Sequence, residues 1–314
     1  MNPTKQHKMR NLVQSALLIA GMAGLGALCT WMIWGDSAAG WMIVAFVALL
    51  IFSPGLSKGT ILALYGARRL TAAEFPEGTA LVERLSQQAE LPQPPELYYV
   101  ASALPNAFTV GRGGDAAIAI SDGLLRVFNA RELASVLAHE ISHIANRDLW
   151  IMGLADVMAR ITTISSYVGM FLLILYLPMV IAGQATVPLA VPLILALSPT
   201  MMSLMQLALS RSREYNADLG AVRLTGDPHG LISALLKLER ITGRFWEEIV
   251  FPGRRIPEPS LLRTHPPTEE RVKRLSELAG GKGVMPWRGP PEWRAPSVPH
   301  VRIPPRWRRT GVWY

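Results

Sequence analysis

Long apolar runs alternate with polar stretches along this chain and give the first indication of its architecture. One run extends from about Val13 to Trp34 without a charged residue, and a second, from about Trp41 to Tyr65, is broken near Pro54. Roughly twenty apolar residues cross the hydrocarbon core of a bilayer, so each run is long enough for a transmembrane helix. Basic residues flank the outer ends of the pair, which places both ends in the cytoplasm by the positive-inside rule. We therefore predict an N-terminal transmembrane hairpin over residues 1–70.

A cleaved signal peptide is the alternative interpretation of the first run, because such a peptide also begins with basic residues. The run is longer than the usual apolar core of a signal peptide. Thr30-Trp31-Met32 is also a poor cleavage site, since signal peptidases require small residues there. We favour an uncleaved first helix.

Two more apolar blocks lie later in the chain, at about Ile164–Gly183 and Val187–Leu209, and neither contains a charged residue. Pro178 and Pro199 imply kinks, which membrane helices tolerate when neighbouring groups satisfy the freed carbonyls. A buried hairpin of a soluble protein is the alternative, but so long a stretch without charge favours membrane spans. We predict a second transmembrane hairpin over residues 161–210, and about four transmembrane helices in total.

Between the hairpins the pattern becomes that of a soluble α+β domain. A helical period predicts a helix over Gly78–Gln88. Three extended stretches separated by glycines and prolines predict a small antiparallel sheet: Glu96–Val100, Ala107–Val110 and Ala116–Ser121. The third stretch is our candidate edge strand, where Ala119 and Ile120 would pair with an extended peptide. A plain core strand is the alternative for these residues.

The next predicted helix carries the candidate chemistry. Asn129 and Glu132 have the spacing of a capping box, and an apolar stripe follows them. His139 and His143 lie four positions apart, so both imidazoles project from one face and can bind one zinc ion. Glu140 points slightly off that axis, beside a water molecule rather than on the metal. H-E-x-x-H therefore predicts a hydrolytic zinc site; the alternative is an ordinary helix with two surface histidines.

A third ligand is expected because an open catalytic zinc site uses three protein ligands. Glu214 lies just past the second hairpin and can fill this role. Asp218 follows one helical turn later and can accept the second ring N–H of a ligating histidine. A charged run on a solvated helix face is the alternative.

Two helices are predicted in the C-terminal part of the chain, over about Pro228–Ile241 and Pro267–Leu278. The segment 281–314 then combines many prolines with arginines and four tryptophans, which predicts an extended or disordered tail. Arginine and tryptophan together suit an anionic membrane surface or a partner domain.

Composition narrows the protein class further. Charged residues make up 17% of the chain, below the usual quarter or so of a soluble protein. The single cysteine, Cys29, excludes an intramolecular disulfide framework. The net charge is +8, but much of the basic excess lies near the N-terminus and in the tail, so we expect no nucleic-acid partner.

Several motifs occur in an order that resembles a known family. They are His139-Glu140-Ile141-Ser142-His143, the segment Arg213–Asp218, Pro105-Asn106-Ala107-Phe108, and Thr264-His265-Pro266-Pro267 with Arg271 after it. With the four apolar blocks, they resemble the HtpX-type membrane zinc metallopeptidases, relatives of the CAAX prenyl endopeptidase and of OMA-type proteases. The resemblance covers about Asn11 to Leu278.

The resemblance implies a zincin-like catalytic domain assembled from residues 71–160 and 211–280, with one Zn²⁺ per chain. His139, His143 and Glu214 would bind the zinc, with Glu140 as the base. His265, Arg271 and Asn106 would surround the tetrahedral intermediate. His265 or Arg271 can donate to the developing oxyanion, and Asn106 can hold a substrate backbone group.

The implied function is an endopeptidase that hydrolyses misfolded or damaged membrane proteins in the cell membrane. Its catalytic domain and both termini would lie in the cytoplasm. A narrow-specificity enzyme of the prenyl-protein type is one alternative, but such enzymes have more spanning helices. An inactive membrane scaffold is another, against which the intact motif argues. A transporter is the weakest, since no charged or polar residue is buried within the apolar blocks except near their breaks.

Overall fold

The structure is a computed structural model that describes residues 3–37, 40, 44, 57–111, 113–183, 188–249 and 267–279. His265 and the tail 281–314 lie outside these residues. The chain divides into two compact units, described separately below. Residues 9–55 and 150–212 form the helical unit; the sheet unit comprises residues 1–8, 56–149 and 213–314. The segment just before residue 70 thus belongs with the sheet, although it was expected in the N-terminal hairpin.

Three helices are long and apolar enough to cross a membrane within the described part of the chain. The candidate spans are Met9–Ser37, Asp148–Ile181 and Ala190–Thr225. They correspond to α1 (Pro3–Trp34) with the short η1 (Gly35–Ser37), to α7 (Asp148–Ile181) and to α8 (Ala190–Thr225). The expected fourth span, Trp41–Tyr65, lies mostly outside the described residues.

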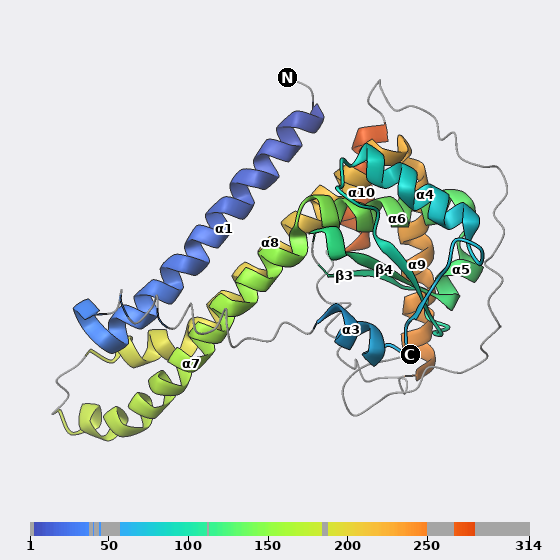
Figure 1. The fold of residues 1–314 in the computed structure, drawn as a ribbon. Coiled ribbons are helices and arrows are strands. Elements are labelled where there is room, and N and C mark those ends of the chain that lie inside the picture. The colour runs from blue at the N-terminus through green and yellow to red at the C-terminus, as the bar shows by residue number, and fades with distance from the viewer. Residues whose placement is uncertain are drawn as a thin grey trace. The chain divides into compact units, whose positions relative to one another are not determined.

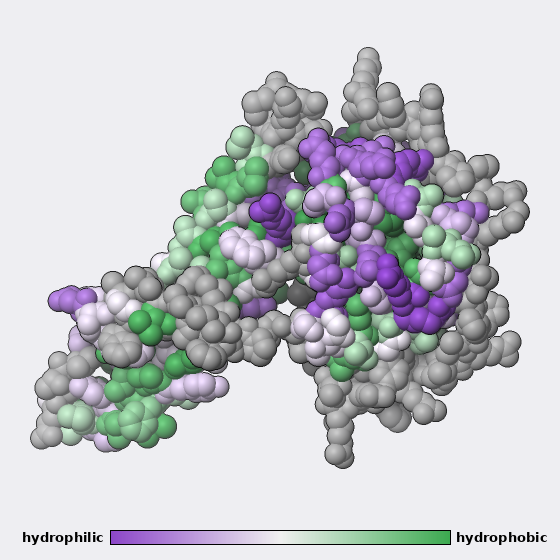
Figure 2. Space-filling model, in the orientation of Figure 1, coloured by the Kyte–Doolittle hydropathy of each residue, from purple (hydrophilic) through white to green (hydrophobic). Residues whose placement is uncertain are grey.

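Side chains of the helical unit separate into a small core and a large apolar exterior. Met22, Cys29, Leu195 and Met202 are fully buried against one another. Gly169 allows α7 and α8 to pack closely, since a Cβ there would lie 2.6 Å from the Ala196 nitrogen. Outside this core, hydrophobic residues cover much of the unit, whereas hydrophilic residues dominate the visible face of the sheet unit (Figure 2). Small residues at the helix contact and large apolar residues outside it are typical of membrane helices.

The sheet contains four strands in the order β1-β2-β4-β3. These are β1 (Arg68–Arg69), β2 (Glu96–Val100), β3 (Ala107–Val110) and β4 (Ala117–Ser121). β4 pairs antiparallel with β3 but parallel with β2. The sheet is therefore mixed: the β1–β2 and β3–β4 pairs are antiparallel, as expected, whereas the β2–β4 pair is parallel, which was not expected. β3 does not pair with β2, the strand before it in the sequence. Instead, β4 lies between β2 and β3 and pairs with both.

β4 is an inner strand, so the prediction that it forms an exposed edge was wrong. Neighbouring strands pair with both of its sides, and Ala119 and Ile120 are completely buried. Their backbone groups cannot pair with a peptide. Among the described residues, β3 is the edge of the sheet on the side next to α6 (Ala130–Ala145).

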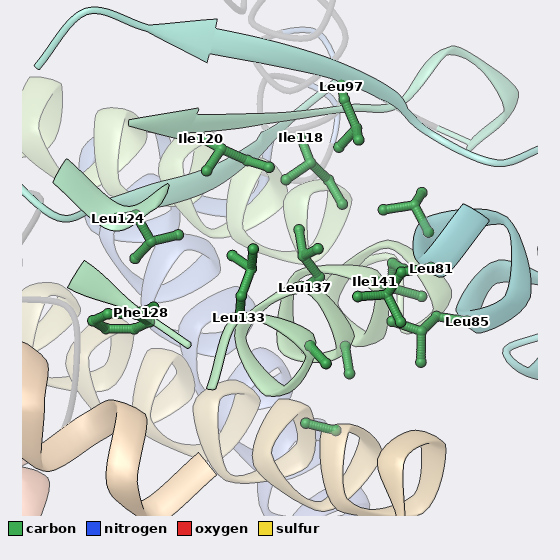
Figure 3. Close-up of a cluster of buried hydrophobic side chains, with 14 of the residues drawn as sticks. Leu81, Leu85, Leu97, Ile118, Ile120, Leu124, Phe128, Leu133, Leu137 and Ile141 are labelled. Atoms are coloured by element: carbon green, nitrogen blue, oxygen red, sulfur yellow. The ribbon is translucent and has the colours of Figure 1, made fainter. Parts of the chain in front are cut away.

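Alternate residues of β4 build two different cores. Ile118 and Ile120 face α6, packing with Leu133, Leu137 and residues of flanking helices (Figure 3). Ala117 and Ala119 face the other way, where Leu62 of α3 packs against them. The strands thus lie between α3 on one side and α4 with α6 on the other (Figure 1). The remaining helices are α3 (Lys58–Leu64), α4 (Pro76–Gln88), α5 (Asp122–Val127), α9 (Pro228–Ile249) and α10 (Thr268–Ala279).

The start of α6 is fixed by a capping box, as predicted from Asn129 and Glu132. The Asn129 side chain accepts from the Glu132 N–H, and the Glu132 carboxylate accepts from the Asn129 N–H. Glu132 is buried and also accepts from Ser233 at 2.7 Å and Lys237 at 2.5 Å, both on α9. One carboxylate therefore begins α6 and joins it to α9.

Replacing Glu132 with alanine should lower the free energy of unfolding by about 2–3 kcal/mol, through the lost cap and the unpaired Lys237. Thermal unfolding of the detergent-solubilised full chain measures this loss. Glu83→Ala, on an exposed face of α4, is the matched control and should change little. An equal effect of both substitutions would contradict the assignment.

Acid should act through the same carboxylate. Burial raises the pKa of Glu132, but hydrogen bonds from Lys237, Ser233 and the Asn129 N–H outweigh it and hold the pKa below its ordinary value of 4.5. Such a group stabilises the fold above its unfolded pKa, and this stabilisation is lost as pH falls through the folded pKa. Wild type should therefore lose stability below about pH 4.5, and Glu132→Gln should lose less over the same range.

Candidate metal centre

Three side chains that can bind a metal converge beside α6. They are His139, His143 and Glu214, whose ligand atoms all lie within 4.8 Å of one another. His139 Nε2 lies 3.1 Å from His143 Nε2 and 3.4 Å from Glu214 Oε2, and His143 Nε2 lies 3.6 Å from Glu214 Oε1. Tetrahedral zinc with bonds near 2.0–2.1 Å requires ligand separations of about 3.3 Å. The three donors therefore fit one zinc ion.

Helix geometry and one glycine bring the ligands together. The two histidines lie one turn apart on α6, with their rings perpendicular and the ring centroids 4.7 Å apart. Glu214 comes from α8, which packs directly on α6 because Gly220 has no side chain. A Cβ at Gly220 would lie only 1.9 Å from Ser142 Oγ. Any larger residue would push α8, and with it Glu214, away from the histidines.

His139 is oriented by a carboxylate and an arginine behind it. Its Nδ1 lies 3.1 Å from Asp218 Oδ1, the contact that the spacing of Glu214 and Asp218 suggested. Arg271 Nε and Nη2 donate to Asp218 at 2.8 and 2.6 Å, and Arg271 Nη1 lies 3.6 Å from Glu214 Oε2. With Nδ1 held in this way, Nε2 of His139 is left for a metal.

His143 has an equivalent arrangement that was missed from the sequence. Its Nδ1 lies 2.8 Å from Asp148 Oδ2, and Arg213 Nε donates to Asp148 Oδ1 at 2.6 Å. Asp148 and Arg213 are both buried. Asp148 is the first residue of α7, and the available signal was an aspartate five positions after the second histidine, at the start of an apolar helix. Arg213 was recognised only as part of a motif.

The electrostatics of the site favour a cation. Burial lowers the pKa of His139, but Asp218 and Glu214 more than offset it and raise the pKa to about 10 in the absence of metal. The same carboxylates stabilise a divalent ion in place of the proton, because a metal and a proton compete for the same imidazole nitrogen. Charge and geometry thus agree with a metal centre.

Glu140 is not among the three ligands and is held by the edge strand. Its Oε2 accepts a 2.7 Å hydrogen bond from Thr109 Oγ1 on β3. Glu140 is only 8% exposed, although it adjoins the candidate ligand His139. Sequence reasoning identified Glu140 but missed Thr109.

The other expected substrate-contacting residues have different surroundings. Asn106 is exposed and directly precedes β3; its N–H donates to Ser121 Oγ and its C=O accepts from the Ser121 N–H. Arg271 is 6% exposed; its Nε and Nη2 donate to Asp218, and its Nη1 lies 3.6 Å from Glu214 Oε2. Ala119 and Ile120 lie inside the sheet.

Comparisons with known proteins identify the family of this chain. Residues 72–279 match the sequence profile of peptidase family M48. A protease HtpX homologue of Pyrococcus furiosus is 38% identical over 290 residues, covering 87% of this chain and 98% of that protein. One of Pyrococcus abyssi is 37% identical over 302 residues, covering 88% and 98%. The crystal structure of S. mikatae Ste24p aligns over 86% of this chain and 66% of that chain, with 16% identity and a TM-score of 0.45. The chain is a member of peptidase family M48 and, within it, of the HtpX-type membrane proteases.

Proposed function

We propose that this protein is a zinc-dependent endopeptidase that cleaves misfolded or damaged membrane proteins, with its sheet unit on the cytoplasmic side of the cell membrane. The single observation that carries the proposal is the spacing of the His139, His143 and Glu214 donor atoms. Two imidazoles and one carboxylate form the ligand set of many catalytic zinc sites, and they leave a coordination position for the reaction.

In the proposed mechanism His139, His143 and Glu214 would hold one zinc ion, and Asp218 and Asp148 keep the imidazoles of His139 and His143 in the binding orientation. When bound, the ion would supply Lewis acidity, which makes water a stronger acid and a peptide carbonyl a better electrophile. Glu140 takes the proton from the attacking water and later delivers it to the leaving amine. Arg271 acts as a positioning residue, through Asp218.

The edge strand β3 supplies a place for the substrate. A peptide in extended form can add to an exposed strand edge through backbone hydrogen bonds, which do not depend on its sequence. β3 adjoins α6, so a peptide on this edge would run beside Glu140. Recognition through the backbone suits unfolded segments, because only these can become a new strand.

The membrane side of the proposal rests on charge and hydropathy. The three candidate spans expose many large apolar side chains, among them Phe171 and Ile174, as lipid contact requires. Basic residues in the first turns of α1 and near the end of the apolar part of α8 favour cytoplasmic placement of these ends. A protease anchored in this way meets substrates that are themselves in the membrane.

Glu140→Gln tests the proposal directly. The variant should retain zinc, because Glu140 is not among the ligands, and should cleave about 10²–10⁴-fold more slowly, because its amide cannot accept the proton. Metal analysis of the detergent-purified full chain and cleavage of labelled, unfolded casein measure the two effects. Glu83→Gln, on an exposed face of α4, is the control. Cleavage by Glu140→Gln near the wild-type rate would refute the role of Glu140, and a wild type without zinc or cleavage would refute the function.

A further inference from the structure

Thr109 has a position that no other described residue of the edge strand shares. Its side chain points toward α6, where Oγ1 donates to Glu140 Oε2 at 2.7 Å. Its neighbours Phe108 and Val110 point to the opposite face of the sheet and pack with Ala117 and Ala119. The period of two along a strand therefore makes Thr109 the residue of β3 that reaches the base.

The backbone of Thr109 points in a third direction, to the open edge. Glu96 N–H donates to Ala116 C=O, and Ser121 N–H donates to Asn106 C=O. Even-numbered residues of β4 thus pair with β2, and odd-numbered residues pair with β3. Because the register sets Val110 opposite Ala117 and Phe108 opposite Ala119, those two residues of β3 use their backbone groups on β4. The N–H and C=O of Thr109 consequently face away from β4, on the side where no described strand pairs.

We infer that Thr109 is a positioning residue that couples substrate docking to the general base. A peptide added to β3 would hydrogen-bond the Thr109 backbone, while the hydroxyl of the same residue fixes one oxygen of Glu140. The second oxygen is then held ready for proton transfer. Peptide binding to β3 and the orientation of Glu140 are therefore coupled, since Thr109 takes part in both. This inference rests on the proposed function.

Three substitutions at this position separate the hydroxyl from the strand. Thr109→Val keeps the shape and the β-branched backbone preference but removes the donor, so kcat should fall by about ten- to a hundredfold with KM changed by less than about threefold. Thr109→Ser keeps the donor and should restore most of kcat. Thr109→Ala, which cannot crowd the site, should behave like the valine variant. Thr79→Val on α4, whose hydroxyl bonds the Phe75 carbonyl, is the matched control and should match wild type.

The assay uses the detergent-purified full chain with bound metal and an internally quenched, extended peptide, from which kcat and KM are both obtained. A wild type that does not cleave would refute the proposed function itself. An active wild type with equal kcat in Thr109→Val would overturn only the inference about Thr109. Equal losses in the serine and valine variants would also overturn it, because the hydroxyl would then not be the cause.

Discussion

Replacing Glu214 with alanine should remove the bound metal and all measurable peptidase activity while the protein stays folded. Two imidazoles alone bind zinc weakly, since the carboxylate supplies both the third bond and a negative charge in a buried site. Metal content should fall from about one ion per chain to near zero, as measured by elemental analysis of the detergent-purified protein. Thermal unfolding adds a second readout, because a chelator should destabilise wild type but not the variant.

Glu239→Ala is the control for this experiment, as Glu239 is an exposed carboxylate on α9. It should keep wild-type metal content, activity and sensitivity to the chelator. A Glu214→Ala protein that retained stoichiometric zinc would show that another residue supplies the third bond. The convergence of the three donors would then need a different explanation.

Arg271→Met should cost about 3–5 kcal/mol of stability, because it removes the guanidinium from the buried Asp218 carboxylate and leaves only His139 beside it. Asp218 is 4% exposed and receives two hydrogen bonds from this one guanidinium. Metal affinity should fall as well, by about 10–100-fold, since Asp218 orients His139. Thermal unfolding of the metal-free protein and zinc titration measure the two losses separately.

A second substitution identifies the cause. Asp218→Asn added to Arg271→Met removes the buried charge that has lost its arginine, so it should recover part of the stability but none of the zinc affinity. Lys273→Met, on the exposed face of α10, is the control and should leave both quantities unchanged. If the double variant were instead less stable than Arg271→Met, the buried charge of Asp218 would not be the cause of the lost stability.

The strands and helices near the site were largely predictable from local pattern. β2 and β3 have the expected bounds, and the capping box at Asn129 begins α6 where the spacing predicted. The order of the strands was not predictable. The alternation of apolar and polar residues shows which face of a strand is buried, but it does not show which strands pair with it. The unbroken apolar run of β4 was in fact the mark of an inner strand. β1, with two residues, is too short to leave a periodic signal.

The candidate ligands could be identified because helical spacing alone brings His139 next to His143. Their supporting residues depend on long-range packing. Thr109 reaches Glu140 across 31 positions of sequence, and Asp148 matters only because α7 begins next to His143. Arg271 was singled out as part of a motif, yet its contact with Asp218 depends on how α10 packs against α8, which no spacing in the sequence encodes.

The ligands are divided between α6 and the far end of α8, 71 positions after His143, with the apolar hairpin between them. A ribosome therefore completes both histidines and the base well before it makes Glu214. The growing chain has no complete ligand set while the hairpin is being synthesised and inserted. We expect that this order of synthesis keeps the protease inactive until its second apolar hairpin has been made.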